Sequence, residues 1–546
     1  MVNRYLFIGV VLLLLTSTLL ADANSESGSS NSNACRFAPL YSMNDILENE
    51  ESINSFIENV LYWEGNFQTD GVGINIATGY TYDGHALDYS TGEIASYGLH
   101  NFSAPSKESI HLGMLARALI STNGINVPNA LDFFHVKVNQ TQQEKETIYK
   151  SGNQNLDNVI TILYRKIKTY EDFLQNYPGY GGFMPWVSVD DNGISPIPGY
   201  WTGRVPGLDN GEMIWGIYSV YNILISNSTY STNYPDLGQR YKSYFDTLAS
   251  NAIMMFYNSN GYISSVTSIK DIFAQPTADN YQNDGGYLDD PYEGELLTVF
   301  MDLFCQWPSR QALDQVWINK RTLLQSTVFS TPKGDITVQK GWWFSSHEQW
   351  KYLMLPYQSI DINRRIFLNG ERARTWFSFI NEYPGLFASV TNVSLPNDNP
   401  NYVSATGIQS ISFETILTND LMTPYGSFPL FLTGEPSLGL SWYYNMLIAP
   451  AMQNPYGSTE SFNPQGTEIS PVITWDSKIT TVLSIVGGLA DVNGIFLAID
   501  GKLDRFQYII NREWSLAFPN IQGEDLPFMY PQVQTPMKLN DFSMCN

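Results

Sequence analysis

Three short segments of the chain combine acidic side chains with glycine and aromatic residues, each where a hydrophobic helix is expected to begin. They comprise residues 199–212, 283–295 and 470–476. Carboxyl groups can cut a glycosidic bond when one protonates the leaving oxygen and another activates water. The two roles need one carboxyl group with a raised pKa and one that stays ionised. These segments are therefore our candidates for a catalytic centre.

Glu295 is the candidate for the general acid. It follows Gly294, precedes an apolar run, and is predicted to lie one step inside a helix spanning residues 291–305. No helix-capping duty explains a carboxyl group at that position. Burial there would disfavour the charged form and raise the pKa, as a proton donor requires.

Asp476 is the candidate for the base. It follows Trp475 and opens a predicted helix over residues 476–489. A helix N-terminus favours the ionised carboxylate, which suits a general base or a nucleophile. An ordinary N-cap aspartate would explain the same position, so both interpretations stay open.

Two further acidic pairs have the three-residue spacing of a helix capping box, namely Asp209 with Glu212 and Asp290 with Glu293. Pro291 adds to the second case, because proline is favoured in the first turn of a helix. Asp209, Glu212 and Glu293 therefore have both a structural and a functional interpretation.

Other catalytic motifs are missing from the sequence. It has no glycine-rich phosphate loop and no G-x-S-x-G elbow, which argues against phosphoryl transfer and α/β-hydrolase chemistry. The histidines lack metal-ligand spacing, and His347-Glu348 is not followed by the second histidine of a zinc helix. We therefore expect no metal and no organic cofactor.

The composition favours a neutral glycan as the partner. The 53 acidic and 29 basic residues give a net charge of −24 at pH 7, which argues against nucleic acid and anionic polysaccharides. Aromatic residues make up 14% of the chain. Their flat rings suit the faces of pyranose sugars, although large cores also use many of them.

The N-terminus has the pattern of a secretory signal peptide. Arg4 precedes an apolar run over residues 5–20, and Ala21-Asp22-Ala23 is a cleavage site of the A-x-A type. A membrane anchor is the alternative, but the run is shorter than the ~20 residues that span a bilayer. We expect a signal peptide over 1–23, a disordered Ser/Asn-rich linker over 24–34, and a secreted protein with no membrane segment after cleavage.

Cysteine usage and glycosylation motifs fit the secretory pathway. Three cysteines are too few for a disulfide scaffold. Cys305 follows Phe304 inside an apolar helical run, so we expect it to be a buried free thiol. Cys35 and Cys545 lie at opposite ends of the mature chain, and termini often approach each other, so a disulfide between them is our hypothesis. The predicted glycosylation sites are Asn101, Asn139, Asn227 and Asn392.

Apolar residues at spacings of three and four predict helices throughout residues 35–546. The predicted helices span 44–62, 107–121, 154–177, 212–226, 236–257, 291–305, 311–325, 347–357, 364–382, 441–452, 476–489 and 505–514. Short β-hairpins are expected in the long loops, at 262–267 and 335–339. We predict an all-α fold, with one catalytic domain over 35–546 that is a single (α/α)6 barrel with long loops. An irregular all-α assembly of two or three domains is the alternative.

Four segments resemble the fungal-type endo-β-1,2-glucanases, glycoside hydrolase family 162, and more distantly the bacterial β-1,2-glucanases of family 144 and the glycoamylase-like domains. They are LDNGE (208–212), YEGELL (292–297), WKYLMLP (350–356) and SPVITWD (470–476), in the expected order. The resemblance implies an (α/α)6 barrel that hydrolyses linear β-1,2-glucan internally to short sophoro-oligosaccharides. It also implies anomeric inversion, no metal or organic cofactor, and an acid that acts through a substrate hydroxyl.

Carried over to this chain, the resemblance places the acid in segment 293–295 and the base at Asp476. We prefer Glu295 over Glu293, because a cap explains Glu293 and glycoamylase-like motifs keep only the later glutamate. Lys351 stands where relatives often carry an acid, which puts the subsite contacts there in doubt. Each ring among the substrate-binding candidates could instead belong to the core. These candidates are Trp201, Arg204, Asp209, Glu212, Trp343 and Trp475.

Three other functions share parts of this pattern. The nearest is a transglycosylase on β-1,2-glucan, or a hydrolase of another neutral β-glucan, with the same fold. An (α/α)6 polysaccharide lyase would need a cation to neutralise a uronate, which the acidic chain disfavours. The third is a secreted glycan-binding protein without catalysis. For partners, we predict a monomer that binds neutral β-1,2-glucan and no nucleic acid.

Overall fold

The computed structural model describes residues 34–120, 130–134, 136–394 and 401–545. The predicted signal peptide and nearly all of the predicted linker lie outside these residues. The α-helices are α2 (Met43–Glu48), α3 (Glu50–Gly65), α4 (Pro105–Ile120), α5 (Gln142–Thr147), α6 (Gln154–Asn176), α7 (Gly207–Ser226), α8 (Ser228–Asn233), α9 (Pro235–Phe256), α10 (Glu295–Phe304), α11 (Arg310–Arg321), α12 (Trp350–Met354), α13 (Asp361–Ile380), α14 (Phe428–Phe431), α15 (Pro436–Leu447), α16 (Trp475–Ile485), α17 (Ala490–Ile499) and α18 (Leu503–Ala517).

The strands are short and pair in antiparallel sheets of two or three. They are β1 (Ile74–Asn75), β2 (Tyr80–Thr81), β3 (Gly84–Leu87), β4 (Ile94–His100), β5 (Phe102–Ser103), β6 (Val187–Asp190), β7 (Gly193–Pro196), β8 (Arg204–Pro206), β9 (Tyr257–Asn258), β10 (Tyr262–Ile263), β11 (Val266–Ile269), β12 (Tyr281–Asn283), β13 (Ser326–Thr331), β14 (Gly334–Gln339), β15 (Val390–Thr391), β16 (Tyr402–Val403), β17 (Gln453–Asn454), β18 (Gly457–Ser458), β19 (Ser461–Phe462), β20 (Ile469–Ser470) and β21 (Val472–Thr474).

Most helices lie within a few residues of their predicted bounds, and the differences have local causes. The first predicted helix is divided at Asn49, whose side chain accepts the Ser52 N–H and caps α3. α10 begins at Glu295 rather than at residue 291, because Asp290 accepts the N–H groups of Tyr292 and Gly294 in a turn. The sequence pattern did not predict α5, α8, α14 or α17.

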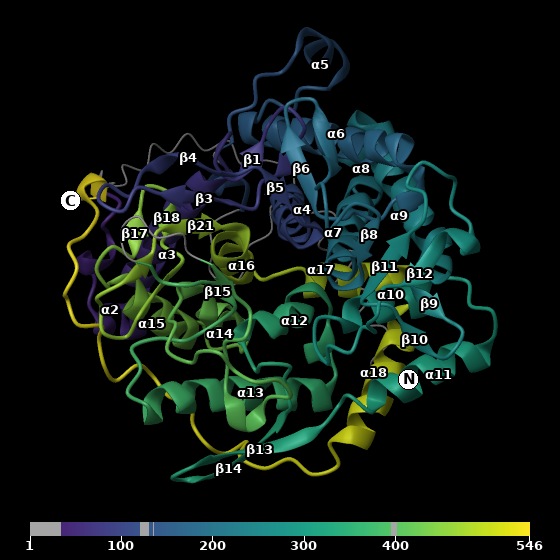
Figure 1. The fold of residues 1–546 in the computed structure, drawn as a ribbon. Helices are drawn as coiled ribbons and strands as arrows, with labels where there is room; N and C mark the ends of the chain where they lie inside the picture. The colour runs from purple at the N-terminus through teal and green to yellow at the C-terminus, as the bar shows by residue number, and fades with distance from the viewer. Residues whose placement is uncertain (1–33, 121–129, 135, 395–400, 546) are drawn as a thin grey trace. The chain divides into compact units, whose positions relative to one another are not determined.

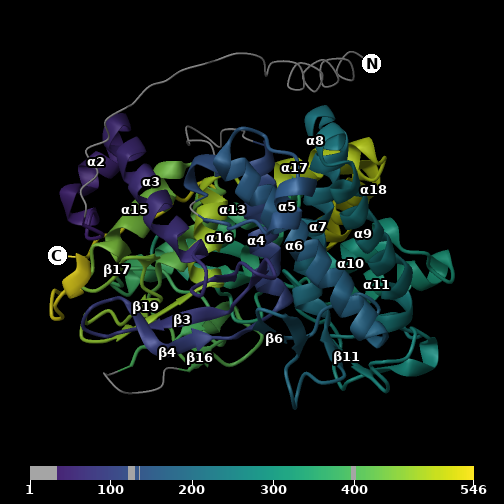
Figure 2. The ribbon, with the colours of Figure 1, turned by 90° about the horizontal axis from the view of Figure 1, so that it is seen from above.

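Two classes of helix alternate along the chain. α4, α7, α12, α14 and α16 lie toward the middle of the view, with longer helices such as α6, α9 and α13 around them (Figure 1). α16 is buried along its whole length, whereas α6 exposes one face. Seen from above, short strands including β3, β4, β6 and β11 gather along one side of the helices (Figure 2). Residues Ala34–Asn546 form one compact unit.

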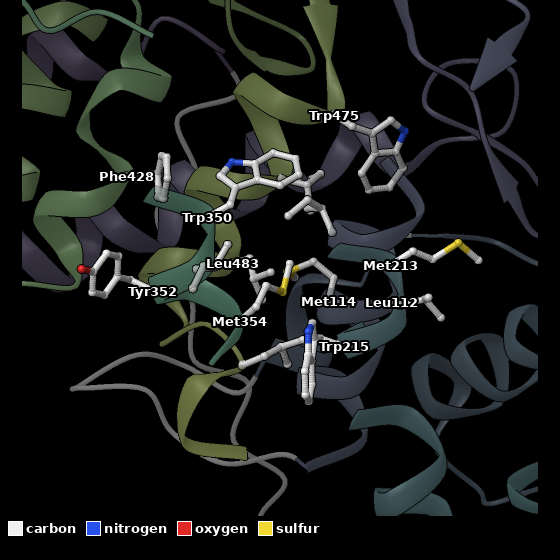
Figure 3. Packing of buried hydrophobic residues seen from close by; sticks show 14 of the residues in the cluster. Leu112, Met114, Met213, Trp215, Trp350, Tyr352, Met354, Phe428, Trp475 and Leu483 are labelled. Carbon is white, nitrogen blue, oxygen red and sulfur yellow. The ribbon is translucent and has the colours of Figure 1, made fainter. Parts of the chain in front are cut away.

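Buried side chains of α4, α7, α12, α14 and α16 meet in the core (Figure 3). Gly216 on α7 allows the closest approach, because a Cβ atom there would lie 2.7 Å from Leu112 Cβ on α4. Trp215, the next residue, is fully buried and donates its indole N–H to the Leu296 carbonyl of α10. α7 is therefore in direct contact with both α4 and α10.

A three-stranded sheet, with the order β21–β3–β4, leads directly into α16. β21 pairs with β3 at Val472↔Ala86, Ile473↔His85 and Thr474↔Gly84, and the chain then enters α16 at Trp475. Thr474 is the N-cap of α16 and accepts the Ser477 N–H. This sheet fixes the position of the first turn of α16, which carries Asp476.

The structure joins Cys35 and Cys545 in a disulfide, with their Cα atoms 4.6 Å apart. Cys305 is a free thiol that is partly rather than fully buried. Asn101, Asn139 and Asn392 are exposed, and Asn227 is half-buried where its side chain caps α8. Across the described ranges, no single helix is long and apolar enough to cross a membrane; only the bent pair α16–α17 would qualify by length and composition.

Candidate active site

A cavity of about 510 Å³ opens among the N-terminal ends of α4, α7 and α16. Each helix begins directly or one residue after a short strand, β5, β8 or β21, so the sheets set where these helix ends lie. The cavity brings together polar residues that are far apart in the sequence. Its charged and titratable lining residues are Asp83, His100, Lys107, Asp209, Glu212, His347, Tyr97, Tyr402 and Asp476.

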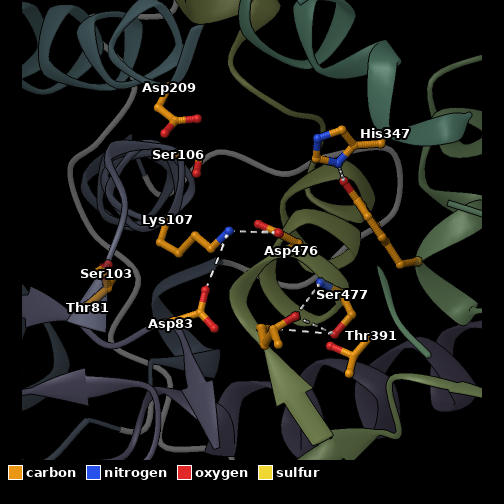
Figure 4. Close-up of polar contacts among 12 residues, drawn as sticks. Thr81, Asp83, Ser103, Ser106, Lys107, Asp209, His347, Thr391, Asp476 and Ser477 are labelled. Atoms are coloured by element: carbon orange, nitrogen blue, oxygen red, sulfur yellow. Dashed lines mark hydrogen bonds and ion pairs between the residues drawn. The ribbon is translucent and has the colours of Figure 1, made fainter. Parts of the chain in front are cut away.

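Asp476, a lining residue of this cavity, forms an ion pair with Lys107 (Figure 4). Lys107 Nζ donates to Asp476 Oδ2 at 2.9 Å and lies 3.7 Å from Asp83 Oδ1. His100 Nδ1 is 3.0 Å from the other Asp83 oxygen. Asp476 is not the N-cap of α16, since Thr474 has that role. The capping interpretation of Asp476 is therefore wrong, and its carboxylate instead faces a cation.

Charge pairing shifts the pKa values of these partners. Burial alone would raise the Asp83 pKa, but His100 and Lys107 outweigh it and lower that pKa. Burial opposes the charged form of Lys107, yet Asp476 and Asp83 together raise the Lys107 pKa. The His100 pKa is likewise raised, because the Asp83 carboxylate outweighs burial. The pair Lys107–Asp476 is thus a stable cation–carboxylate contact.

Glu212 and Asp209 come from the first turns of α7. Neither is part of a capping box, because α7 begins at Gly207 with Pro206 as its N-cap and no side-chain cap. Asp209 Oδ2 accepts the indole N–H of Trp186 at 2.8 Å. Glu212 is fully buried and neither carboxyl oxygen has a hydrogen-bond partner. Burial, with the charges of Asp209 and Asp476, raises its pKa well above the ordinary value.

Glu293 lies in the turn before α10 and contacts His347, a lining residue of the cavity. His347 Nε2 is 3.4 Å from Glu293 Oε1, and Glu293 Oε2 has no partner. Asp290 caps the turn alone, so the predicted capping box with Glu293 is not present. Burial, followed by the charges of Glu212 and Asp290, raises the Glu293 pKa well above its ordinary value.

Glu295 is the first residue of α10, not one step inside it, and lies outside the cavity lining. Its Oε1 accepts the Tyr357 hydroxyl at 2.6 Å, and the side chain is fully buried. Burial raises its pKa, while Lys351 and Lys320 counteract part of that shift. Burial in turn lowers the Lys351 pKa to about 8. Glu295 is therefore a buried carboxyl group that Tyr357 holds in the core.

None of the remaining predicted sugar-binding residues lines the cavity, although Trp201 stacks on the lining residue Trp186. His100, Phe102, Trp186 and Trp201 stack in sequence, with successive ring centroids 5.9, 6.0 and 5.4 Å apart. Arg204 is bound to Asp284 at 2.6 Å, and its guanidinium lies over the Tyr200 ring. Trp343 is half-buried and is not among the lining residues.

Trp475 faces the core rather than the cavity. It is fully buried, donates its indole N–H to the Gly73 carbonyl and packs on Phe67. Its ring is therefore not exposed to a sugar.

Sequence reasoning missed Lys107, Asp83 and Trp186, which all line the cavity. Lys107 falls at the start of a predicted helix, but nothing in the sequence marks its partner 369 positions away. His347 entered the sequence analysis only as part of an incomplete zinc motif. No local signal marks Lys107, because its neighbours Ser106, Glu108 and Ser109 are polar, as is usual near the start of a helix.

A larger groove, of about 650 Å³ near Arg165 and Asp191, has a different character. Its main ion pair, Arg165 with Glu144, joins partly exposed side chains. Within the ranges that the structure covers, no group of three His, Cys, Asp or Glu side chains has the geometry of a metal site. Buried carboxyl groups beside an ion-paired carboxylate suit general acid–base chemistry.

A family model described as endo-β-1,2-glucanase SGL matches residues 80–546 of the chain. No curated protein sequence matches this chain. An endo-β-1,2-glucanase from Talaromyces funiculosus, solved with sophorose, is 37% identical, with a TM-score of 0.86 over 94% of this chain and 100% of that chain. A Glu-to-Gln mutant of the Talaromyces funiculosus enzyme, solved with β-1,2-glucan, is also 37% identical, with a TM-score of 0.85 over 94% of this chain and 100% of that chain.

Two bacterial proteins share the fold at lower identity. An endo-β-1,2-glucanase from Chitinophaga pinensis, solved with sophorotriose and glucose, is 12% identical, with a TM-score of 0.52 over 88% of this chain and 99% of that chain. A glucoamylase-like protein from Bacteroides fragilis is 10% identical, with a TM-score of 0.53 over 86% of this chain and 97% of that chain. The helix-rich fold therefore resembles that of glycoside hydrolases.

Proposed function

Because this chain belongs to glycoside hydrolase family 162, the endo-β-1,2-glucanases, we propose that it cuts linear β-1,2-glucan internally, with inversion, to sophoro-oligosaccharides. It is a glycoside hydrolase that acts on β-1,2-glucan. The observation that carries the mechanism is one cavity lined by Asp476, which is ion-paired with Lys107, and by Glu212, which has a raised pKa. Glu293, whose pKa is also raised, lies outside the lining but contacts the lining residue His347.

Asp476 is the general base in this proposal. Its carboxylate is held by Lys107, and Asp476 lines the cavity from the first turn of α16. It takes a proton from the water that attacks the anomeric carbon, so the bond to the leaving sugar breaks with inversion. Lys107 holds the carboxylate in place before the attack.

Glu293 is the general acid in this proposal, in place of the Glu295 that we preferred from the sequence. The Glu293 carboxyl contacts His347, a cavity residue, and its raised pKa keeps a proton available. Glu295 is bound to Tyr357 and faces Lys351 in the core. The proton reaches the glycosidic oxygen through a substrate hydroxyl, as the family resemblance implies. Glu212, which also lacks a partner, is the second candidate.

The fold proposed for this catalytic unit is an (α/α)6 barrel. Outer and inner helices alternate along the chain, and six such pairs can be formed. The pairs are α3–α4, α6–α7, α9–α10, α11–α12, α13–α14 and α15–α16. Burial supports the assignment, since the inner helices α4, α12 and α16 are buried almost completely.

The cellular setting is part of the proposal. We propose a secreted monomer whose signal peptide ends at Ala23 and which carries glycans at exposed sequons. The exposure of Asn101, Asn139 and Asn392 supports glycan attachment at those sites. The net charge of −24 supports a neutral polysaccharide as substrate.

The activity is tested by measuring reducing ends released from linear β-1,2-glucan, with laminarin, cellulose and starch as controls. We expect release from β-1,2-glucan alone, with sophoro-oligosaccharides as products and an inverted anomer at early times. Products with the retained configuration would contradict the acid–base mechanism. Products longer than the substrate would show transglycosylation instead.

A further inference from the structure

The β3–β4 hairpin carries an irregularity at the mouth of the active-site cavity. Leu87 pairs with Ile94 and His85 pairs with Leu99, so residues 95–98 stand opposite Ala86 alone. Within this bulge, Tyr97 has a φ of 63°, in the left-handed region that side chains other than glycine rarely adopt. Bulges of this kind re-aim a side chain and are frequent beside active sites.

The bulge holds the Tyr97 side chain in solvent. Tyr97 is 106% exposed relative to an extended reference, the highest value among the exposed large hydrophobic residues. Gly98 passes so close to β3 that a Cβ atom there would lie 2.9 Å from the Ala86 Cβ. The chain therefore returns to the sheet at Gly98 and directs Tyr97 outward. Folding alone favours neither the strained backbone nor the solvated ring.

Tyr97 belongs to the lining of the cavity that holds Asp476. The two residues belong to one continuous unit, because β4 pairs with β3, β3 pairs with β21, and β21 leads into α16. Tyr402 on β16, which also lines the cavity, is 54% exposed. The wall of the cleft thus presents tyrosine rings to the solvent.

We propose that Tyr97 forms a sugar-binding subsite at the mouth of the cleft. Its ring packs against the C–H face of a glucosyl residue in a neutral β-glucan chain, remote from the bond that is cut. The proposal rests on the function proposed above, because it needs the cavity to bind a glucan. The backbone strain is offset on binding, when the exposed ring becomes buried against the sugar.

The test compares Tyr97→Ala, Tyr97→Phe and a control, Tyr508→Ala, on full-length protein. Tyr508 is 58% exposed on α18 and does not line the cavity. With long β-1,2-glucan, we expect Tyr97→Ala to raise KM roughly 5- to 20-fold and to leave kcat within about twofold. Tyr97→Phe keeps the ring and stays near wild type. The KM effect disappears on oligosaccharides too short to reach the mouth of the cleft.

Thermal stability separates binding from a structural role. Tyr97→Gly removes the left-handed strain, so we expect a melting temperature no lower than wild type together with the raised KM. A structural tyrosine would instead lower the melting temperature when replaced. An unchanged KM on long glucan for Tyr97→Ala, or an equal rise for Tyr508→Ala, would overturn the subsite. A wild-type protein that releases no reducing ends would contradict the proposed function itself.

Discussion

The acidic residues of the site differ in what surrounds them, although they share one chemical group. Asp476 is paired with Lys107, whereas Glu212 has no hydrogen-bond partner and Glu293 only a histidine contact. Removing a carboxyl group from water disfavours its charge unless a cation is close. The cavity lining therefore holds an ion-paired carboxylate, Asp476, and a buried carboxyl group with a raised pKa, Glu212, while Glu293 contacts the lining residue His347. Hydrolysis by acid and base needs such a difference between carboxyl groups.

Exchanging single carboxyl groups for amides identifies the acid. We expect Glu293→Gln to lower kcat by roughly 10²- to 10⁴-fold, because the amide cannot donate the proton. Glu295→Gln should keep most of the activity and lose about 1–3 kcal/mol of folding stability, since it alters a buried hydrogen-bonded group. Steady-state kinetics and thermal unfolding of both variants provide the measurement.

The same assignment predicts the basic limb of the pH profile. An acid must be protonated to act, and the Glu293 pKa is raised above the ordinary value. Activity of the wild type should therefore persist to a pH well above the normal pKa of a glutamate, and fall as that group loses its proton. If Glu295→Gln is inactive and Glu293→Gln is active, the general acid is Glu295. If only Glu212→Gln loses activity, the general acid is Glu212 on α7.

At the scale of elements, the sequence predicts helices whose hydrophobic residues recur with a regular local spacing. Hydrophobic periodicity predicted helices such as α6 and α9, because each has one apolar face. It placed the start of α10 four residues early, since the Asp290 turn depends on side-chain hydrogen bonds that periodicity does not record. Glu293 was consequently explained as a cap when it is not one.

The assembly of the site could not be predicted in the same way. Lys107 and Asp476 lie on separate helices, and their contact arises from the packing of α4 against α16. The acidic segments were predictable as candidates because they precede helices and carry unusual composition. Their partners, Lys107, His347 and Trp186, have no distinctive spacing, so only the three-dimensional structure brings them into the cavity.

Packing between the central helices gives a prediction about one glycine. Gly216→Ala on α7 would place a methyl group 2.7 Å from Leu112 Cβ, so α4 and α7 must separate. We expect a loss of about 1–3 kcal/mol in the free energy of unfolding. Because α4 carries Lys107, activity should fall as well. Chemical denaturation followed by fluorescence measures the stability.

Gly370→Ala is the matched control for this substitution. Gly370 is also a buried helical glycine, on α13, but a Cβ atom there would meet its nearest neighbour at 3.6 Å, an ordinary contact. Alanine should therefore be neutral or stabilising by up to about 1 kcal/mol, from its higher helix propensity. Equal losses at both positions would contradict the role assigned to close contact between α4 and α7.

At the scale of the whole molecule, the two ends of the described chain are held together. The Cys35–Cys545 disulfide is reinforced by Arg36, which lies 2.9 Å from Asp541 and donates to the Leu447 and Ile448 carbonyls. These contacts lie on the side of α15, away from the lining of the active-site cavity. The ends therefore stabilise the fold without forming part of the site.

Replacing both cysteines separates stability from catalysis. We expect Cys35→Ser with Cys545→Ser to lose about 3–5 kcal/mol, because a cross-link between distant residues restricts the unfolded chain. The Arg36 contacts remain, so kcat on β-1,2-glucan at 25 °C should stay within about twofold of wild type. Thermal inactivation half-lives and initial rates measure the two effects. Cys305→Ala, which removes the free thiol, serves as the control and should change neither strongly. If the double variant loses activity at 25 °C while still folded, the joined termini shape the cleft as well as stabilising the fold.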